Sequence, residues 1–142
     1  MWKTQGGAAL PANKLNMGIA AFGIAFRLVD PNTDIVGAPT STVPPEEGCY
    51  TAQQGFWSYY ETCLYRQGVA EKWIPSQSVP YAVTQGQWVG YDNTDSLDAK
   101  VAHIKSNGYG GVCVWAVDLD DYTGQFCRNG TNPFITYLKS IL

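Results

Sequence analysis

The stretch that decides the fold reads Gly110-Gly111-Val112-Cys113-Val114-Trp115-Ala116-Val117-Asp118-Leu119-Asp120-Asp121. Two glycines open it, an apolar run rich in valine follows, and three aspartates lie at its end. A short continuous apolar run with such boundaries predicts a strand buried on both faces, as strands of parallel sheets are. Because sites in parallel folds lie at the carboxyl ends of the strands, Trp115 and the aspartates are the first candidates for a functional site.

The spacing of apolar residues predicts the remaining elements. Helices are predicted over 55–65, 95–106 and the segment that begins at Pro133, with Asn132 as its N-cap. Strands are predicted over 14–23, 70–74, 79–83 and 87–91, with a hairpin turn at Gln85-Gly86 and a long loop over 37–48. Without residues 26–91 the order is strand, helix, strand, helix, which is two β/α units of a parallel α/β architecture. Two parallel strands cannot bury both faces alone, so we expect six further units upstream to complete a (β/α)8 barrel.

The composition restricts the classes of function. The chain has 142 residues, enough for one domain, and its net charge of −3 gives no reason to expect nucleic acid or an anionic membrane as a partner. No apolar stretch has the length of a membrane span, and residues 1–15 lack the apolar core of a signal peptide. Four cysteines without a C-x-x-C pair, together with one histidine, argue against a zinc site. We therefore expect no metal and no cofactor.

Two polar features have specific interpretations. The aspartates Asp118, Asp120 and Asp121 could suggest calcium, but an EF-hand loop also needs glycine at its sixth position and glutamate at its twelfth, and neither spacing is met. We expect them instead to accept hydrogen bonds from loop backbone and a helix N-terminus. Asn129-Gly130-Thr131 is an acceptor sequence for N-glycosylation, which matters only in a secreted protein. Secretion-type features without a signal peptide predict that this is part of a longer chain.

Six pieces of the sequence carry a resemblance to a known family. They are Lys14-Leu15 to Phe26, Gly55-Phe56-Trp57-Ser58-Tyr59-Tyr60-Glu61-Thr62-Cys63, Val79-Pro80-Tyr81, Trp88-Val89-Gly90-Tyr91-Asp92, Gly110 to Phe126, and Pro133-Phe134-Ile135. In this order they resemble the carboxy-terminal part of animal family 18 glycoside hydrolases, the chitinases and chitinase-like lectins. The resemblance implies that residues 1–25 are the strand 7 region of a TIM barrel, 26–91 an inserted α+β chitinase insertion domain, and 92–142 helix 7, strand 8 and helix 8.

The resemblance also implies a ligand and residues that contact it. It implies a secreted protein that binds chitin or N-acetylglucosamine oligosaccharides. Trp115 is then an aromatic floor under a sugar ring, although the residue pattern alone favours a place in the core. Phe22 and Phe56 are candidates for the wall of the pocket, with core packing as the alternative. For all three aromatic residues, ligand contact and core packing both stay open.

The cysteines are expected to differ in state. The resemblance implies a disulfide between Cys63 and Cys127, and Cys63 lies on the apolar face of the predicted helix. Cys113 lies within the predicted strand, so we expect a buried free thiol that packs as a small hydrophobe. Cys49 lies in a loop, and the sequence leaves its state open.

The chain departs from the family pattern where catalysis and sugar contact are concerned. The family's catalytic motif D-x-x-D-x-D-x-E does not occur in these residues, and Glu61 is expected on a helix flank away from the apolar stripe. Ala20, Phe22 and Ile24 stand where the family has Pro, Tyr and Arg, and Gln53 stands where it often has a ligand-contacting glutamate. We therefore expect no catalytic residue here. Three functions stay open: one wall of the cleft of an active chitinase, a lectin that binds without hydrolysis, and a structural module without a sugar site.

Overall fold

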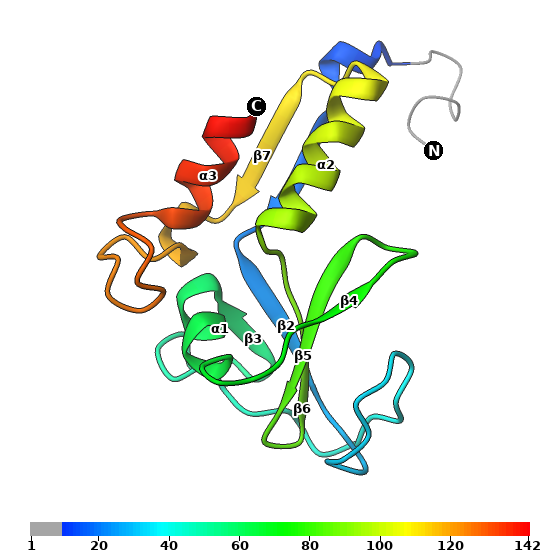
Figure 1. Cartoon of the computed structure of the whole chain (residues 1–142), viewed down its shortest axis with the longest axis vertical. Coiled ribbons are helices and arrows are strands. Elements are labelled where there is room, and N and C mark those ends of the chain that lie inside the picture. The colour runs from blue at the N-terminus through cyan, green and yellow to red at the C-terminus, as the bar shows by residue number, and fades with distance from the viewer. Residues whose placement is uncertain (1–9) are drawn as a thin grey trace.

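The computed structural model describes residues 10–142 and has an α/β fold with two separate sheets (Figure 1). In chain order the elements are η1 (Ala12–Lys14), β1 (Asn16–Ala20), β2 (Phe22–Arg27), β3 (Phe56–Ser58), α1 (Tyr59–Tyr65), β4 (Lys72–Ile74), β5 (Val79–Thr84), β6 (Gln87–Gly90), α2 (Thr94–Asn107), β7 (Gly111–Trp115), η2 (Val117–Leu119) and α3 (Pro133–Ile141). Strands β1 and β7 form a parallel pair, and the other five form an antiparallel sheet in the order β3-β2-β6-β5-β4. The α/β class predicted from the sequence is confirmed.

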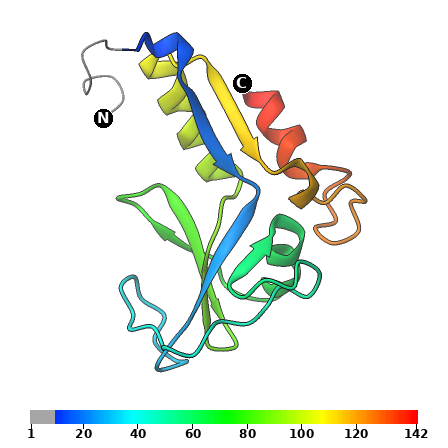
Figure 2. The ribbon, with the colours of Figure 1, turned by 180° about the vertical axis from the view of Figure 1, so that it is seen from behind.

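The parallel pair is covered on one face only. Its register aligns Met17 with Val112 and Ile19 with Val114, and these four side chains pack into the core against α2 and α3. Side chains at the alternate positions point away from the helices, because successive residues of a strand face opposite sides. Figure 2 views this second face, which no element of residues 10–142 covers.

The prediction of a strand over 112–117 that is buried on both faces is wrong for this chain. The strand spans Gly111–Trp115, and Val117 already belongs to η2. Since helices cover only one face, the alternate side chains stay accessible, and Cys113 is an exposed free thiol rather than a buried one.

One apolar cluster joins the parallel pair to its helices. Its buried members are Ile19, Ala21, Leu97, Val101, Leu119, Phe134 and Leu138. On α2 the predicted inner face of Leu97, Val101 and Ile104 is confirmed, and Gly108 ends the helix in the left-handed region at φ 61°. Full burial of an aliphatic or phenylalanine side chain contributes roughly 1.5–3 kcal/mol, so this cluster is what holds the helices on the sheet.

The antiparallel sheet closes a second core of its own. Its buried members are Ala25, Trp57, Ala82, Val89 and Tyr91. The Trp57 ring stacks on Tyr65 of α1 with 3.9 Å between the ring centroids. Gln85 and Gly86 both have positive φ, 51° and 71°, and join β5 to β6, so the predicted hairpin turn is confirmed.

The helix predicted over 55–65 begins later than its apolar spacing suggests. Residues Phe56–Ser58 pair with β2 as strand β3, and the helix starts at Tyr59. The Ser58 hydroxyl accepts a hydrogen bond from the N–H of Glu61, whose carboxylate accepts one from the N–H of Ser58. This reciprocal capping box fixes the first turn, and apolar spacing alone does not reveal it.

The chain passes from the parallel pair into the antiparallel sheet at one residue, Ala21, and returns through α2. The strand predicted over 14–23 is in fact β1 followed by the start of β2, and Ala21 between them is fully buried. Its N–H donates to the carbonyl of Trp115 at 2.9 Å, and its carbonyl accepts from the N–H of Tyr59 at 3.0 Å. The junction is therefore bonded both to the end of β7 and to the start of α1.

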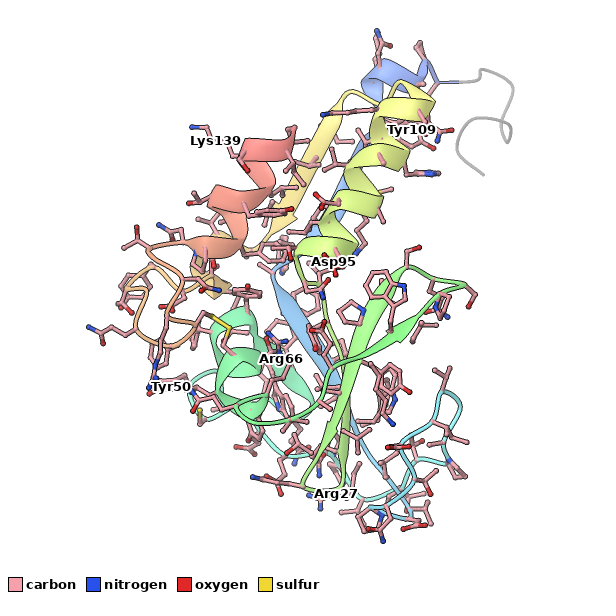
Figure 3. All side chains as sticks on the ribbon, viewed as in Figure 1. Arg27, Tyr50, Arg66, Asp95, Tyr109 and Lys139 are labelled. Carbon is pink, nitrogen blue, oxygen red and sulfur yellow. A yellow bond between two sulfur atoms is a disulfide. The ribbon has the colours of Figure 1, made fainter. Side chains whose placement is uncertain are left out.

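A disulfide adds a covalent crosslink between the two parts. Cys63 of α1 is bonded to Cys127 in the loop between η2 and α3, which lies 64 positions later, as the resemblance implies. Figure 3 shows it as a yellow bond between α1 and that loop.

Two neighbouring aspartates organise the same loop. Asp120 accepts hydrogen bonds from the N–H groups of Phe134 and Ile135 at the start of α3. The Asp121 carboxylate accepts from the N–H groups of Gly124, Phe126 and Cys127. Burial opposes ionisation of Asp121, but these bonds and one from a threonine hydroxyl hold its pKa below the ordinary value. The expected role of both carboxylates, in bonding loop backbone and a helix N-terminus, is confirmed.

Candidate functional site

Trp115 lies at the carboxyl end of β7 with 71% of its surface exposed. Its Cα pairs with that of Ala20, its carbonyl accepts from the N–H of Ala21, and its peptide bond to Ala116 is cis. The backbone is therefore held by hydrogen bonds while the ring faces outward. An indole presented in this way is a flat surface for the apolar face of a sugar or another ring. The exposure rules out a core position for this side chain within the described residues.

Phe22 and Phe56 form a pair of rings on the adjacent sheet. Phe22 begins β2, directly after the buried junction, and Phe56 begins β3. Their centroids are 4.6 Å apart at an interplanar angle of 33°, and both rings are half-buried against the core of the parallel pair. The structure thus brings two of the three candidate ligand-contacting residues together. Trp115 is not part of this ring pair, but its strand partner Ala20 lies two residues before Phe22.

The face of β2 that carries Phe22 continues with apolar side chains. Ile24 is 40% exposed and Phe26 is 45% exposed, and the Phe26 ring contacts Trp88 with centroids 6.1 Å apart. Gln53 is exposed in the loop before β3. The two positions at which the resemblance implies a guanidinium and a carboxylate therefore present an alkyl group and an amide. This face carries no formal charge at either position.

Glu61 lies elsewhere than the sequence analysis predicts. It is fully buried rather than on an outer flank of α1. Its carboxylate accepts hydrogen bonds from the N–H groups of Tyr50 at 2.6 Å, Thr51 at 2.9 Å and Ser58 at 2.7 Å. Burial opposes its ionisation, but these bonds outweigh that effect and hold the pKa of Glu61 below its ordinary value. Because the buried carboxylate is bonded to the backbone of Tyr50 and Thr51, it anchors the 48–54 loop to the start of α1.

The anchored loop is connected to the candidate site. The Thr51 hydroxyl oxygen lies 3.0 Å from both the carbonyl of Phe56 and the Glu61 carboxylate, so its one proton is shared between these two acceptors. A Cβ on Gly48 would lie 2.6 Å from that carboxylate, so the loop passes too close for a side chain. The sequence does contain a signal for this arrangement, the spacing Ser58-x-x-Glu61 of a capping box. The apolar spacing points the other way, because it predicts a helix from residue 55 and so places Ser58 inside the helix instead of at its cap.

Among residues 10–142, no group of three or more His, Cys, Asp or Glu side chains is arranged to hold a metal ion. Within the same residues, none of the helices has the length and apolar character needed to cross a membrane.

Comparison with known proteins identifies the family. The sequence pattern of glycosyl hydrolases family 18 matches residues 1–120. The chain belongs to this family. Mouse chitotriosidase-1 is 39% identical over 142 residues, which is 100% of this chain and 29% of that protein. Human chitinase-3-like protein 2 is 40% identical over 133 residues, 94% of this chain and 34% of that protein. This family 18 chain therefore spans about a third of the length of the curated relatives that it matches.

Solved family 18 structures superpose closely on it. YKL-39, solved in the presence of chitooligosaccharides, has a TM-score of 0.88 and 39% identity, covering 93% of this chain and 36% of that chain. Human YKL-39 is a pseudo-chitinase with retained chitooligosaccharide binding properties. A group IV chitinase from Ostrinia furnacalis has a TM-score of 0.85 and 32% identity, covering 93% of this chain and 36% of that one. A chitinase and a pseudo-chitinase are both similar to this family 18 chain. Overall similarity therefore does not distinguish hydrolysis from binding, and the residues of the candidate site must be compared instead.

Proposed function

We propose that this chain forms one wall of a chitooligosaccharide-binding cleft in a secreted family 18 protein. Trp115 is the floor under one N-acetylglucosamine ring, and the Phe22 and Phe56 pair is part of the wall. The observation that carries the proposal is the exposed Trp115 ring, 71% accessible on a backbone fixed by β1. The chitooligosaccharide binding of YKL-39, whose structure superposes on this chain, supports the same ligand class.

The proposed cleft follows from a proposed architecture. Residues 1–25 and 92–142 supply strands 7 and 8 of a (β/α)8 barrel with their helices, and 26–91 form the α+β insertion domain. Support comes from the parallel register of β1 and β7 and from helices that cover one face of the pair only. In a closed barrel the other face points inward, and residues at the carboxyl ends of the strands line the site.

Binding without hydrolysis is the activity that we assign to these residues. In this family the substrate's acetamido group attacks the anomeric carbon while a carboxylic acid protonates the leaving oxygen. No D-x-x-D-x-D-x-E motif occurs in this sequence, and the Glu61 carboxylate is buried and bonded to backbone N–H groups. Ile24 and Gln53 further replace side chains that would contact sugar. These replacements favour the lectin over the chitinase as the function of this chain.

The decisive experiment is a titration of the chain with an N-acetylglucosamine tetramer. Trp115→Ala removes the stacking surface and should weaken binding by ~1–3 kcal/mol, which is about 5- to 150-fold in Kd. Trp73→Ala is the control. Trp73 is a second exposed tryptophan, 40% accessible, but it lies on β4, the far edge strand of the antiparallel sheet. Equal affinity of Trp115→Ala and wild type would refute the sugar-binding role.

Two further measurements separate binding from catalysis. Ile24→Arg should add contacts and tighten binding without producing turnover of the tetramer, because no acid is gained. Turnover by the wild-type chain that is lost when one of its glutamates is changed to Gln would overturn the assignment as a binding protein.

A further inference from the structure

The loop between η2 and α3 carries the one N-glycosylation acceptor sequence of the chain, Asn129-Gly130-Thr131. All three residues are exposed in the folded structure. The loop is well fixed at this point: Gly130 adopts φ 80°, and the N–H of Asn132 donates to the carbonyl of Asp121 at 2.8 Å. The acceptor side chain is therefore presented to solvent from a defined backbone.

Asn129 also lines a polar pocket of about 450 Å³ between α1 and this loop. The pocket is formed by Tyr59, Cys63, Arg66, Gln67, Gly68, Phe126, Cys127, Arg128 and Asn129. Its size lies within the range of small-ligand sites. Besides Asn129 it combines the Gln67 amide and the Arg128 guanidinium, which can donate hydrogen bonds to hydroxyl and acetamido oxygens, with two aromatic rings; Arg66 also lines it, but its Nη1 already donates to Glu71 and Tyr91. This chemistry suits an amino sugar.

We propose that Asn129 carries an N-linked glycan whose first N-acetylglucosamine lies in this pocket, over the Cys63–Cys127 disulfide. The disulfide supports passage through an oxidising secretory compartment, where such glycans are added. Like the proposed function, this proposal requires a secreted protein, but it does not require a chitin-binding cleft.

The modification is a transfer from a lipid-linked oligosaccharide diphosphate. The Asn129 amide nitrogen attacks the anomeric carbon of the N-acetylglucosamine that is bonded to the diphosphate, the bond from that carbon to the diphosphate oxygen breaks, and the lipid diphosphate leaves. The nitrogen loses one proton as the N-glycosidic bond forms. Thr131 supplies the hydroxyl that the acceptor sequence requires.

The site is tested by translating the chain behind a signal peptide in the presence of endoplasmic-reticulum microsomes, which reports the modification without requiring secretion. We expect one glycan, removed by a peptide N-glycosidase with conversion of Asn129 to Asp. Thr131→Ala and Asn129→Gln should abolish it, and Thr131→Ser should retain it. An unmodified wild-type chain in microsomes that glycosylate a control protein would overturn the proposal.

The position of the first sugar is tested on protein purified from a secreting eukaryotic cell line. We expect dithiothreitol to reduce the Cys63–Cys127 bond several-fold more slowly in the glycosylated chain than after enzymatic removal of the glycan. Arg128→Ala, which removes one pocket guanidinium, should shorten this protection without reducing glycan occupancy. Equal reduction rates with and without the glycan would show that the sugar lies outside the pocket.

Discussion

The antiparallel sheet and the parallel pair of this chain differ in how completely they are closed. In the antiparallel sheet Ala82 and Val89 are fully inaccessible, and the strands that carry them, β5 and β6, each have a paired neighbour on both sides. In the parallel pair one face is packed and the other carries the exposed Cys113 and Trp115. Parallel strands need crossovers and cover on both sides, so two of them cannot complete a core. The incompletely closed region is the one that presents the candidate ligand-binding ring.

The largest expected effect comes from removing the disulfide that joins these regions. Cys63→Ser with Cys127→Ser opens a loop of 64 positions, and the chain-entropy argument puts the loss in unfolding free energy at roughly 4 kcal/mol. The measurement is the urea midpoint of the double variant against wild type. Cys49→Ser and Cys113→Ser, which change the two free cysteines, should leave the midpoint in place. Identical midpoints for the double variant and wild type would contradict the prediction.

The next effect concerns the anchor inside the antiparallel region. Glu61→Gln replaces a buried acceptor by an amide whose NH2 group faces backbone N–H groups, and should lower the unfolding free energy by about 2–3 kcal/mol. Glu47→Gln, at an exposed position, is the control and should change it by less than ~0.5 kcal/mol. A Glu61→Gln chain as stable as the control would show that the carboxylate is dispensable.

The same carboxylate predicts a pH dependence with a definite sign. Its folded-state pKa lies below the ordinary value of 4.5, so the unfolded chain binds more protons in the acid range. The stabilisation is complete above that ordinary value and is lost as the pH falls through the folded-state pKa. Denaturant titrations from pH 6 downward should show wild type losing more stability than Glu61→Gln. Parallel pH curves for the two proteins would be the opposite result.

A smaller difference is expected in local opening. Strands β1 and β7 each have an unpaired edge within the described residues, whereas β5 and β6 lie inside the antiparallel sheet. Amide hydrogens of β1 and β7 should exchange at least about tenfold faster than those of β5 and β6. Uniform protection across both sheets in the monomer would remove the distinction between the two regions.

The smallest expected effect is on the stability of the Trp115→Ala variant. Because 71% of this residue is exposed, its truncation should change the unfolding free energy by less than ~0.5 kcal/mol. Thermal unfolding of the purified variant measures this. A loss of several kcal/mol would mean that the ring has a packing role, and would weaken its assignment to ligand binding.

The elements that the sequence predicts well are those with local signals. Helix α2 follows from its apolar spacing and from Gly108 at its end, and the β5–β6 hairpin follows from Gln85-Gly86. Apolar spacing cannot reveal the start of α1 at Tyr59, because the same spacing continues through β3, whose strand pairing with β2 is a tertiary contact.

For the candidate site, residue type and strand end point to Trp115, but its exposure could not be predicted from an apolar run. Burial of a strand depends on which elements pack on each face, and that is not a local property. Glu61 illustrates the converse: its local capping signal was present, while its burial depends on the Tyr50 and Thr51 backbone reaching it from the preceding loop.

The disulfide also determines how the chain would respond to tension applied at its two ends. The bond between Cys63 and Cys127 transmits force directly from α1 to the loop before α3. The 64 positions between the two residues, at ~3.4 Å each, amount to roughly 220 Å of contour length that pulling cannot extend. Strands β4 to β7 and helix α2 lie within that segment, so the crosslink keeps them from being pulled out as extended chain. Under tension the chain therefore separates into an extensible part, outside residues 63–127, and a part that the crosslink protects. This division does not coincide with the boundary between the two sheets.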